Sequence, residues 1–404
     1  MLSYARSRNF PIHLLAFWWM LWLVVSNSDL SEFTPPSWET LAQYGLFVLF
    51  FVAGHAAVKH RHALGFAGAN RKARPFRADS NRMKWALRGS ALVCAAMLLY
   101  SLSLSGALSS DFVEYFAKLR LEEDSMDSLT GIRALDVLTK ILAFPLSYTI
   151  VLIVLADHVR HFRWTLALCV FNLVAYSYLW QVNYPLIHLT WFLVFHLLMQ
   201  AHRRGEFEKR TITVVLILFS TLLASAANRF GGDVLGGLQR YVVGYHLVGF
   251  SFYDYQYHDP NSILHIYSYG RSSLGFLDQM LEAVSKMAGA DYKAASFENS
   301  TYNNEAVDIG RSEFRAFNAF GTLLFSLYRD FHMVGILVGG FAYGALTTHA
   351  LYQSARNWVC GAFFIMLASS WMMGMMVNPL EQAYFWFAVV VLGAFSLVNR
   401  GIRF

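Results

Sequence analysis

Apolar segments recur along most of the chain, separated by short polar connections. An α-helix needs roughly 17–25 apolar residues to cross a bilayer. Ten segments meet this requirement, at 11–28, 38–58, 85–106, 136–156, 164–181, 184–200, 211–227, 331–353, 358–377 and 383–399. Backbone polar groups in lipid must be satisfied within the segment, so these runs predict helices. We therefore predict an all-α polytopic integral membrane protein with about ten transmembrane helices and both termini on one side.

Composition agrees with a membrane protein. Of the 404 residues, 56% are hydrophobic and only 14% are charged, whereas soluble domains contain about 25% charged residues. The three cysteines, Cys94, Cys169 and Cys360, all lie inside apolar segments. That location predicts packing residues and excludes a disulfide framework or a cysteine metal cluster.

The distribution of basic residues predicts the orientation. Most of the 32 lysines and arginines lie in alternate connections, above all in the loop 59–84, whereas the connections 29–37, 182–183 and 378–382 contain none. The positive-inside rule then places both termini in the cytoplasm. Topology and anionic headgroups account for the net charge of +6, so no nucleic acid partner is expected. The first run is followed by SNSDLSEF, so we expect it to remain as a helix and not to be a cleaved signal.

One long polar segment interrupts the apolar pattern. It divides the chain into a first bundle of seven helices (1–227), a large periplasmic loop (228–330) and three last helices (331–404). The loop contains apolar stretches at 241–252 and 316–328, which are short for a crossing and predict re-entrant or interfacial helices. If both crossed fully, the protein would have twelve helices.

A third helix is predicted between those two stretches. Leu277, Leu281, Val284 and Ala288 recur at helical spacing, and Gly289 is a stop signal. We expect an amphipathic helix that covers the loop.

Arginine outnumbers lysine in the long loop, which predicts an anionic ligand. Arginine grips phosphate with paired donors and a permanent charge. Four arginines are candidates to surround a pyrophosphate: Arg229, Arg240, Arg311 and Arg315. The alternative is that these side chains lie at the lipid headgroups or pair with neighbouring carboxylates.

Tyrosines in the same loop alternate with acids and amides. Tyr241, Tyr253, Tyr255 and Tyr257 are candidates to stack on sugar rings, while an aromatic belt at the membrane interface is the alternative. The nearby His258, Asp259 and His265 have no standard zinc spacing, so no metal is expected. The sequence also indicates no other cofactor.

The end of the loop carries a resemblance. The run Phe317-Asn318-Ala319-Phe320-Gly321-Thr322, then Tyr328-Arg329-Asp330-Phe331 and a glycine-rich crossing from Val334 to Gly344, resembles the closing signature of the Wzy-type O-antigen polymerases, a family of oligosaccharide repeat-unit polymerases. The large outward loop late in the chain is similar too. One departure is His332, where the family often has glycine.

The resemblance implies a metal-independent, membrane-embedded glycosyltransferase of the bacterial inner membrane, with its active site facing the periplasm. Its substrates would be undecaprenyl-pyrophosphate-linked oligosaccharides, and a chain-length-regulating co-polymerase would be a partner. The candidates for the general base are Glu313, then Asp330 and His246, and Asn318 joins the tyrosines as a glycan ligand. An O-antigen ligase uses the same donor and is the alternative function. A flippase is the second alternative, although it should place charges within several crossings.

Overall fold

The computed structural model describes residues 9–28, 31–65, 81–107, 115, 128–157, 163–204, 212–213, 216–217, 220, 236, 239–304, 306–312, 314, 316–317 and 321–401. By backbone packing the chain divides into two compact units, each built from separate stretches of sequence. Unit 1 comprises Met1–Ala73, Leu197–Tyr352 and Leu367–Gln382. Unit 2 comprises Arg74–His196, Gln353–Met366 and Ala383–Phe404.

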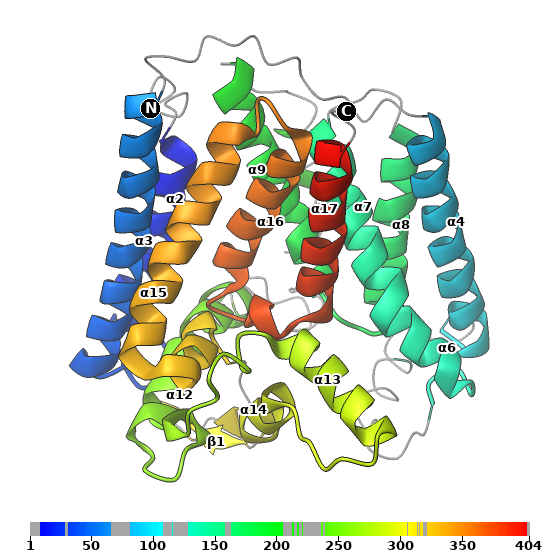
Figure 1. Cartoon of the computed structure of the whole chain (residues 1–404). Coiled ribbons are helices and arrows are strands. Elements are labelled where there is room, and N and C mark those ends of the chain that lie inside the picture. Colours follow the sequence, from blue (N-terminus) through cyan, green and yellow to red (C-terminus); the bar gives the residue numbers. More distant parts are fainter. Residues whose placement is uncertain are drawn as a thin grey trace. The chain divides into compact units, whose positions relative to one another are not determined.

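Helices form nearly all of the described structure (Figure 1). Unit 1 holds α2 (Phe10–Ser26), α3 (Trp38–Gly65), η3 (Gln239–Gly244), α12 (Tyr245–His258), η4 (Ile263–His265), α13 (Gly275–Met287), α14 (Ala295–Asn304), β1 (Val307–Asp308), β2 (Ala316–Phe317), η5 (Pro379–Glu381) and nearly all of α15 (Leu323–Gln353). Unit 2 holds α4 (Asn81–Leu104), α6 (Arg133–Leu138), η1 (Thr139–Ala143), α7 (Phe144–Asp157), α8 (Arg163–Leu179) and α17 (Ala383–Gly401). Two helices, α9 (Tyr184–Arg204) and α16 (Trp358–Met373), have residues in both units.

The predicted apolar segments coincide with helices wherever they are described, apart from shifts at their ends. Among the residues that the structure describes, five helical stretches are long and apolar enough to cross a membrane: Trp38–His62, Met83–Leu104, Arg133–Ala156, Tyr184–Ala201 and Leu323–Gln353. Shorter apolar helices occupy Phe10–Ser26, Trp358–Met373 and Ala383–Leu397. Most of the predicted seventh crossing, 211–227, and of the basic loop 59–84 lies outside the described residues.

The two short helices expected in the long loop differ from the prediction. The first is longer than 241–252, because η3 continues directly into α12 and the helical run covers 239–258. Nearly every residue from His246 to Tyr253 is buried, so this run is enclosed by protein. The stretch 316–328 is not one helix. Residues 316–317 form β2, antiparallel to β1, and the helix that follows begins only at Leu323 and continues into α15.

A kink divides α15 close to the predicted start of its crossing. Phe331 has φ −146° and ψ 25°, and His332 has φ 49° and ψ −136°. A positive φ is uncommon for a residue with a Cβ atom and is readily adopted by glycine. The kink therefore lies at the position where the sequence has histidine in place of the expected glycine. It separates a short first part of α15, residues 323–330, from the long apolar part.

The core of unit 1 is aromatic. Trp19 of α2 and Trp371 of α16 donate reciprocally, the first to the Trp371 carbonyl and the second to the Leu15 carbonyl, each at 3.0 Å. Phe47 and Phe51 of α3 stack on the Trp371 ring with centroids 4.8 and 4.0 Å away. Buried aromatic pairs contribute about 0.5–1.5 kcal/mol beyond their area, so this cluster joins three helices firmly.

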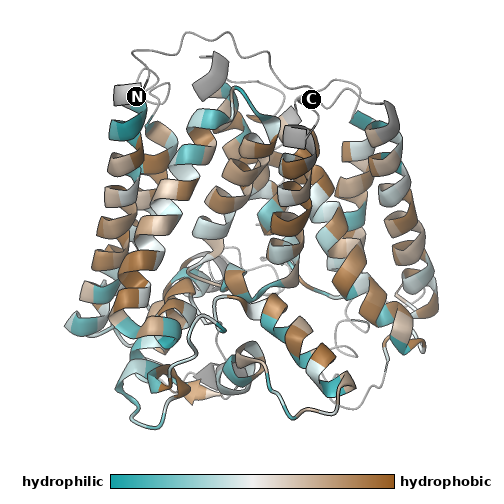
Figure 2. Cartoon of the chain, viewed as in Figure 1, coloured by the Kyte–Doolittle hydropathy of each residue, from teal (hydrophilic) through white to brown (hydrophobic). Residues whose placement is uncertain are grey.

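Glycines bring α3 and α15 into direct backbone contact. A Cβ atom at Gly344 would lie 1.9 Å from the Phe51 carbonyl oxygen, and one at Gly54 would lie 2.1 Å from the Phe341 carbonyl oxygen. Small residues allow such an approach between membrane helices. Figures 1 and 2 show α3 and α15 side by side, with hydrophobic positions along both helices.

Unit 2 packs α4, α7, α8 and α17 around its own core. Some of its buried polar side chains form hydrogen bonds between helices. His188 Nε2 and Tyr384 Oη lie 2.9 Å apart, and Asn172 donates to the Ala91 carbonyl at 3.0 Å. Asp136 accepts from the Thr130 hydroxyl at 2.8 Å and so fixes the turn before α6.

Candidate functional site

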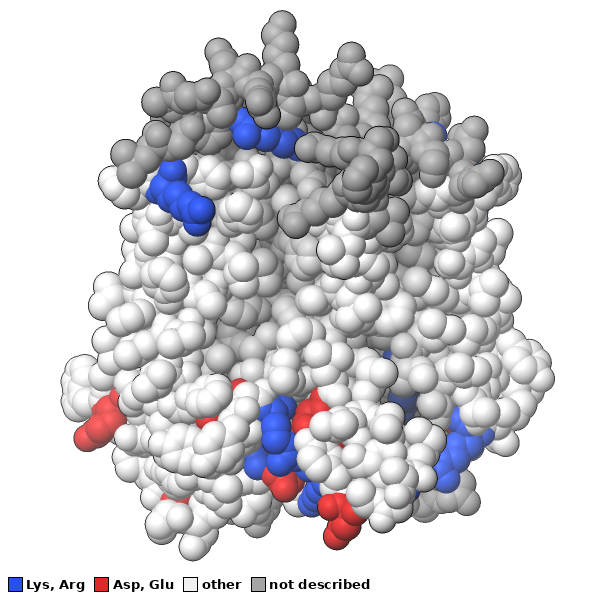
Figure 3. Space-filling view, viewed as in Figure 1, with Lys and Arg blue, Asp and Glu red and all other residues white. Residues whose placement is uncertain are grey.

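Two short connections of unit 1 contact the long polar segment. After α2, the Thr34 amide donates to the Ile309 carbonyl at 2.9 Å, and the Arg311 amide donates to the Glu32 carbonyl at 3.0 Å. After α16, the Leu323 amide donates to the Gly374 carbonyl at 2.7 Å. These connections are two of those predicted to lie on the same side as the long loop. In Figure 3 the acidic side chains on the visible face lie at the end that carries α12–α14.

A buried polar network lies where the connection 374–382 meets α14 and the first part of α15. Its centre is Glu381, whose Oε1 accepts from Ser326 Oγ at 2.6 Å and from Asn299 Nδ2 at 2.5 Å. Ser326 Oγ in turn accepts from Ser272 Oγ at 2.8 Å and from Asn378 Nδ2. Four segments that are distant in sequence therefore converge on one carboxylate.

Burial and hydrogen bonding act in opposite directions on Glu381. Burial raises the pKa of its carboxyl, because removal from water penalises the charged form, while the donors Ser326 and Asn299 lower it. Burial prevails, so the pKa lies above its usual range. Ser326 and Asn299 both donate to Oε1, Asn378 is a further donor, and the residue as a whole is only partly buried.

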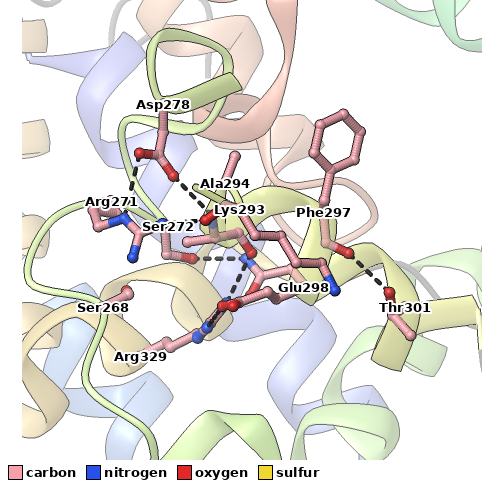
Figure 4. Close-up of polar contacts among 12 residues, drawn as sticks. Ser268, Arg271, Ser272, Asp278, Lys293, Ala294, Phe297, Glu298, Thr301 and Arg329 are labelled. Carbon is pink, nitrogen blue, oxygen red and sulfur yellow. Dashed lines mark hydrogen bonds and ion pairs between the residues drawn. The ribbon is translucent and has the colours of Figure 1, made fainter. Parts of the chain in front are cut away.

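Arg329 holds α14 against the first part of α15 (Figure 4). Its side chain is 2% exposed and forms an ion pair with Glu298. It also donates to the Ala295 carbonyl at 2.8 Å and to Asn299 Oδ1. These contacts orient Asn299 toward Glu381, so Arg329 acts as a positioning residue one step from the carboxyl.

Asp330, at the kink of α15, anchors the loop 268–273. Its Oδ1 accepts from the Ser268 hydroxyl at 2.5 Å and from the Gly270 and Ser272 amides, each at 3.0 Å. Its Oδ2 accepts from the Ser273 amide at 2.9 Å. Successive amides that converge on one anion form a nest. Because both oxygens are engaged, the carboxylate holds the loop in place.

A second polar network joins α13 to the start of α14 and to the segment just before it. Asp278 pairs with Arg271 at 3.3 Å and accepts from the Ala295 amide at 2.7 Å, as Figure 4 shows in part. Arg271 also donates to the Lys293 carbonyl. Glu282 accepts from the Ala294 amide at 2.7 Å and from Lys286. The acidic side of α13 is thus directed into the protein.

The predicted general bases lie in different surroundings. Glu313 lies outside the described residues. Asp330 is buried with four donors, as described above. His246 is buried against α2, where it stacks on Trp22 with ring centroids 4.4 Å apart and meets Trp18 edge-on at 5.3 Å. Aromatic packing is therefore the role that its contacts support.

The four predicted pyrophosphate ligands are described only in part. Arg229 and Arg315 lie outside the described residues, and Arg240 is described only as part of η3. Arg311 is exposed, and its guanidinium donates to the Ser28 carbonyl at 3.2 Å. It follows β1, next to the connection after α2.

The predicted glycan-binding tyrosines divide between core and surface, because they lie on a helix and not on a strand. Tyr253 is buried and donates to Gln43 Oε1 at 2.5 Å. Tyr257 is partly buried and meets the Tyr328 ring at 5.6 Å. Tyr255 is 42% exposed. Tyr241 is described only as part of η3, and Asn318 lies outside the described residues.

A stack of rings at the kink of α15 presents aromatic surface more openly. The Tyr267 ring stacks on the His332 ring with centroids 3.9 Å apart, and the Tyr328 ring stacks on the His332 ring with centroids 4.8 Å apart. Tyr269 stacks on Tyr267 at 5.6 Å and is 74% exposed. These rings suit contact with a sugar better than the buried Tyr253 does.

The sequence reading missed Glu381 and the residues that hold it. The signal was present as NPLEQ, a turn with one acid between two apolar runs. A single acid in a short connection gives no reason to suspect a site until its neighbours are known. Asn299 and Ser326 carry no distinctive pattern, and Arg329 was noted only within the YRDF motif.

Comparison with family models, with curated proteins and with solved structures found no match. Among the residues that the structure describes, no group of three or more His, Cys, Asp or Glu side chains could hold a metal ion.

Proposed function

We propose that this chain is a polymerase of undecaprenyl-pyrophosphate-linked oligosaccharide repeat units, of the O-antigen type. It would act in the inner membrane of a bacterium, with both termini cytoplasmic and the site facing the periplasm. The growing glycan would pass from one lipid carrier to the terminal sugar of a repeat unit on a second carrier. A chain-length-regulating co-polymerase would be its partner in lipopolysaccharide or related polysaccharide biosynthesis.

The observation that carries the proposal is the Glu381 carboxyl. A transferase that joins a sugar hydroxyl to an activated sugar needs a general base whose pKa is close to the working pH. Glu381 has a raised pKa and is partly exposed, so it combines a carboxyl of increased basicity with access from outside the network. It lies in the connection 374–382, which contacts the long polar segment and joins two apolar helices.

The proposed step is a displacement at the anomeric carbon of the donor glycan. The acceptor hydroxyl forms the new C–O bond and gives its proton to Glu381, while the bond from the anomeric carbon to pyrophosphate breaks. The carrier leaves as undecaprenyl pyrophosphate, which takes the electron pair. Fixed positive charge stabilises this leaving group, and Arg229, Arg240, Arg311 and Arg315 are the candidates to supply it.

Glu381 is a stronger candidate for the base than those chosen from sequence. A carboxylate surrounded by donors, as Asp330 is, has both oxygens engaged. The sequence places Glu313 between Arg311 and Arg315, and nearby positive charge makes a carboxylate a weaker base. The ring of His246 is packed between tryptophans.

The test is a polymerisation assay with purified protein, its lipid-linked repeat unit, no nucleotide and excess chelator. We expect a glycan ladder from the natural protein, none from Glu381→Gln and an unchanged ladder from the control Glu39→Gln, which alters an exposed carboxyl on α3. Glutamine can accept the same two hydrogen bonds, so Glu381→Gln should remain folded.

Three outcomes would contradict the proposal. A full ladder from Glu381→Gln would remove Glu381 as the base. Transfer only after addition of lipid A-core would identify a ligase, and no transfer in either case would favour transport.

For the leaving-group site, Arg→Lys at each of the four arginines should abolish the ladder, because lysine lacks the paired donors.

A further inference from the structure

The helix α13 is turned so that its acidic side faces the protein. Asp278 and Glu282, one helical turn apart, are buried at 5% and 4% exposure. Both accept backbone amides from the segment before α14, and Glu282 also pairs with Lys286. Hydrogen bonds from Lys286 and from the Ala294 amide keep the pKa of Glu282 below its usual range. The buried side of this helix is therefore held by polar contacts.

The amphipathic helix predicted from Leu277, Leu281 and Val284 is α13, and its apolar side faces outward. The exposed apolar side chains are Leu274, just before the helix, and Met280, Leu281, Val284 and Met287 within it, with Met287 81% exposed. Figure 2 shows hydrophobic positions along this helix. A contiguous apolar face of this kind marks a contact with lipid or protein.

The start of α13 is fixed at the end of the membrane helices. Gly275, its first residue, has φ +20°, and a Cβ atom there would lie 2.3 Å from the Glu381 Cα atom. Glu381 belongs to the connection between α16 and α17, two of the apolar helices. The connection between two membrane helices lies at the boundary of the bilayer, so the first turn of α13 lies at that depth as well.

The charges around this face suit a bilayer surface. Both carboxylates of the helix point inward, and its one lysine, Lys286, is exposed. An interfacial helix has a polar side, an apolar side and basic residues that meet anionic headgroups.

We propose that the outward face of α13, formed by Leu274, Met280, Leu281, Val284 and Met287, lies in the lipid interface of the bilayer that the protein spans. The acyl chains cover the apolar side chains, and Lys286 faces anionic headgroups. This contact holds the polar segment of unit 1 down on the membrane. It does not depend on the reaction proposed above.

Spin labels on the full-length protein test this contact. In a background without the natural cysteines, one label is placed at Val284→Cys or Met287→Cys, and the control label at Asp291→Cys, an exposed position beyond the helix. The protein is reconstituted in nanodiscs of phosphatidylethanolamine and phosphatidylglycerol. Collisions with oxygen, which enters lipid, are compared with collisions with a nickel chelate, which stays in water.

We expect the ratio of oxygen to nickel collisions at positions 284 and 287 to be several-fold higher than at 291. Lys286→Glu should reduce that difference. Ratios at 284 and 287 equal to that at 291 would show that the face lies in water and would overturn the proposal. Exclusion of both reagents from 284 and 287 would overturn it too, because it would show that protein, such as a second copy or another subunit, covers the face.

Discussion

Replacement of Asp330 by asparagine tests whether this residue anchors the loop 268–273. The carboxylate accepts four hydrogen bonds, three of them from backbone amides at 2.9–3.0 Å. Asparagine keeps one carbonyl oxygen, which can still accept the hydrogen bonds that Oδ1 accepts in the natural protein. Its amide group must then face the Ser273 amide, so two donors oppose each other in a buried place.

The cost can be worked from these contacts. A hydrogen bond to a charged group contributes about 1.5–3 kcal/mol, and a buried donor left without a partner costs about 1–3 kcal/mol. Since such terms are not additive, we take about 3 kcal/mol for the local opening of the loop. At about 1.4 kcal/mol per power of ten, the amides of Gly270, Ser272 and Ser273 should exchange about 100-fold faster.

Hydrogen–deuterium exchange of the detergent-purified protein measures this directly. The control is Asp259→Asn, because Asp259 accepts the Asn261 amide in an exposed turn that asparagine also forms. Unchanged protection of the three amides in Asp330→Asn would refute the anchoring role. Loss of transfer activity with unchanged protection would instead return Asp330 to the reaction itself.

Three further predictions concern α15 and Glu381. Gly344→Ala forces a Cβ atom against the Phe51 carbonyl. It should destabilise the protein by about 1–3 kcal/mol or more through overpacking, and so lower the thermal unfolding midpoint. The control Gly45→Ala on α3, with open space around it, should leave the midpoint unchanged. The His332→Gly variant should be more stable than His332→Ala by about 1–3 kcal/mol, because both lose the ring but only glycine relieves the positive φ. Equal thermal unfolding midpoints of the two variants would refute strain at the kink. Because the pKa of Glu381 is raised in the folded state, the folded protein binds more protons there than the unfolded chain, and this contribution is present at low pH and lost as pH rises through the folded pKa. Glu381→Gln should therefore gain stability relative to the natural protein as the pH rises above the ordinary pKa range of a glutamate carboxyl. A constant difference between the two unfolding midpoints as the pH rises would contradict the raised pKa.

The helices were predictable because membrane solvation acts locally. A run such as 38–58 must satisfy its own backbone in lipid, so its length and hydropathy are enough to predict α3. The same reasoning fails in the long loop, because its backbone N–H and C=O groups can also form hydrogen bonds with water or with other parts of the protein. Residues 316–317 could therefore pair as a strand, and the helix predicted at 241–252 extends over 239–258 and includes Tyr253.

The candidate site was predictable only in its parts. The YRDF motif drew attention to Arg329 and Asp330, but their roles depend on partners about 30 and 60 residues away in sequence, such as Glu298 and Ser268. Glu381 could not be found at all, because its raised pKa arises from burial by segments that the chain brings together only on folding.

The sequence by itself determined that this is a helical membrane protein, and where most of its apolar helices lie, because those properties follow from the local balance of apolar and polar side chains. Only the tertiary structure decided which way α13 faces, which carboxylate anchors a loop and which one has a raised pKa. Those outcomes depend on contacts between distant segments, such as Gly275 against Glu381 and Asp330 against the loop 268–273. Burial and hydrogen bonding at such contacts set the chemistry of a side chain, and sequence position alone does not reveal them.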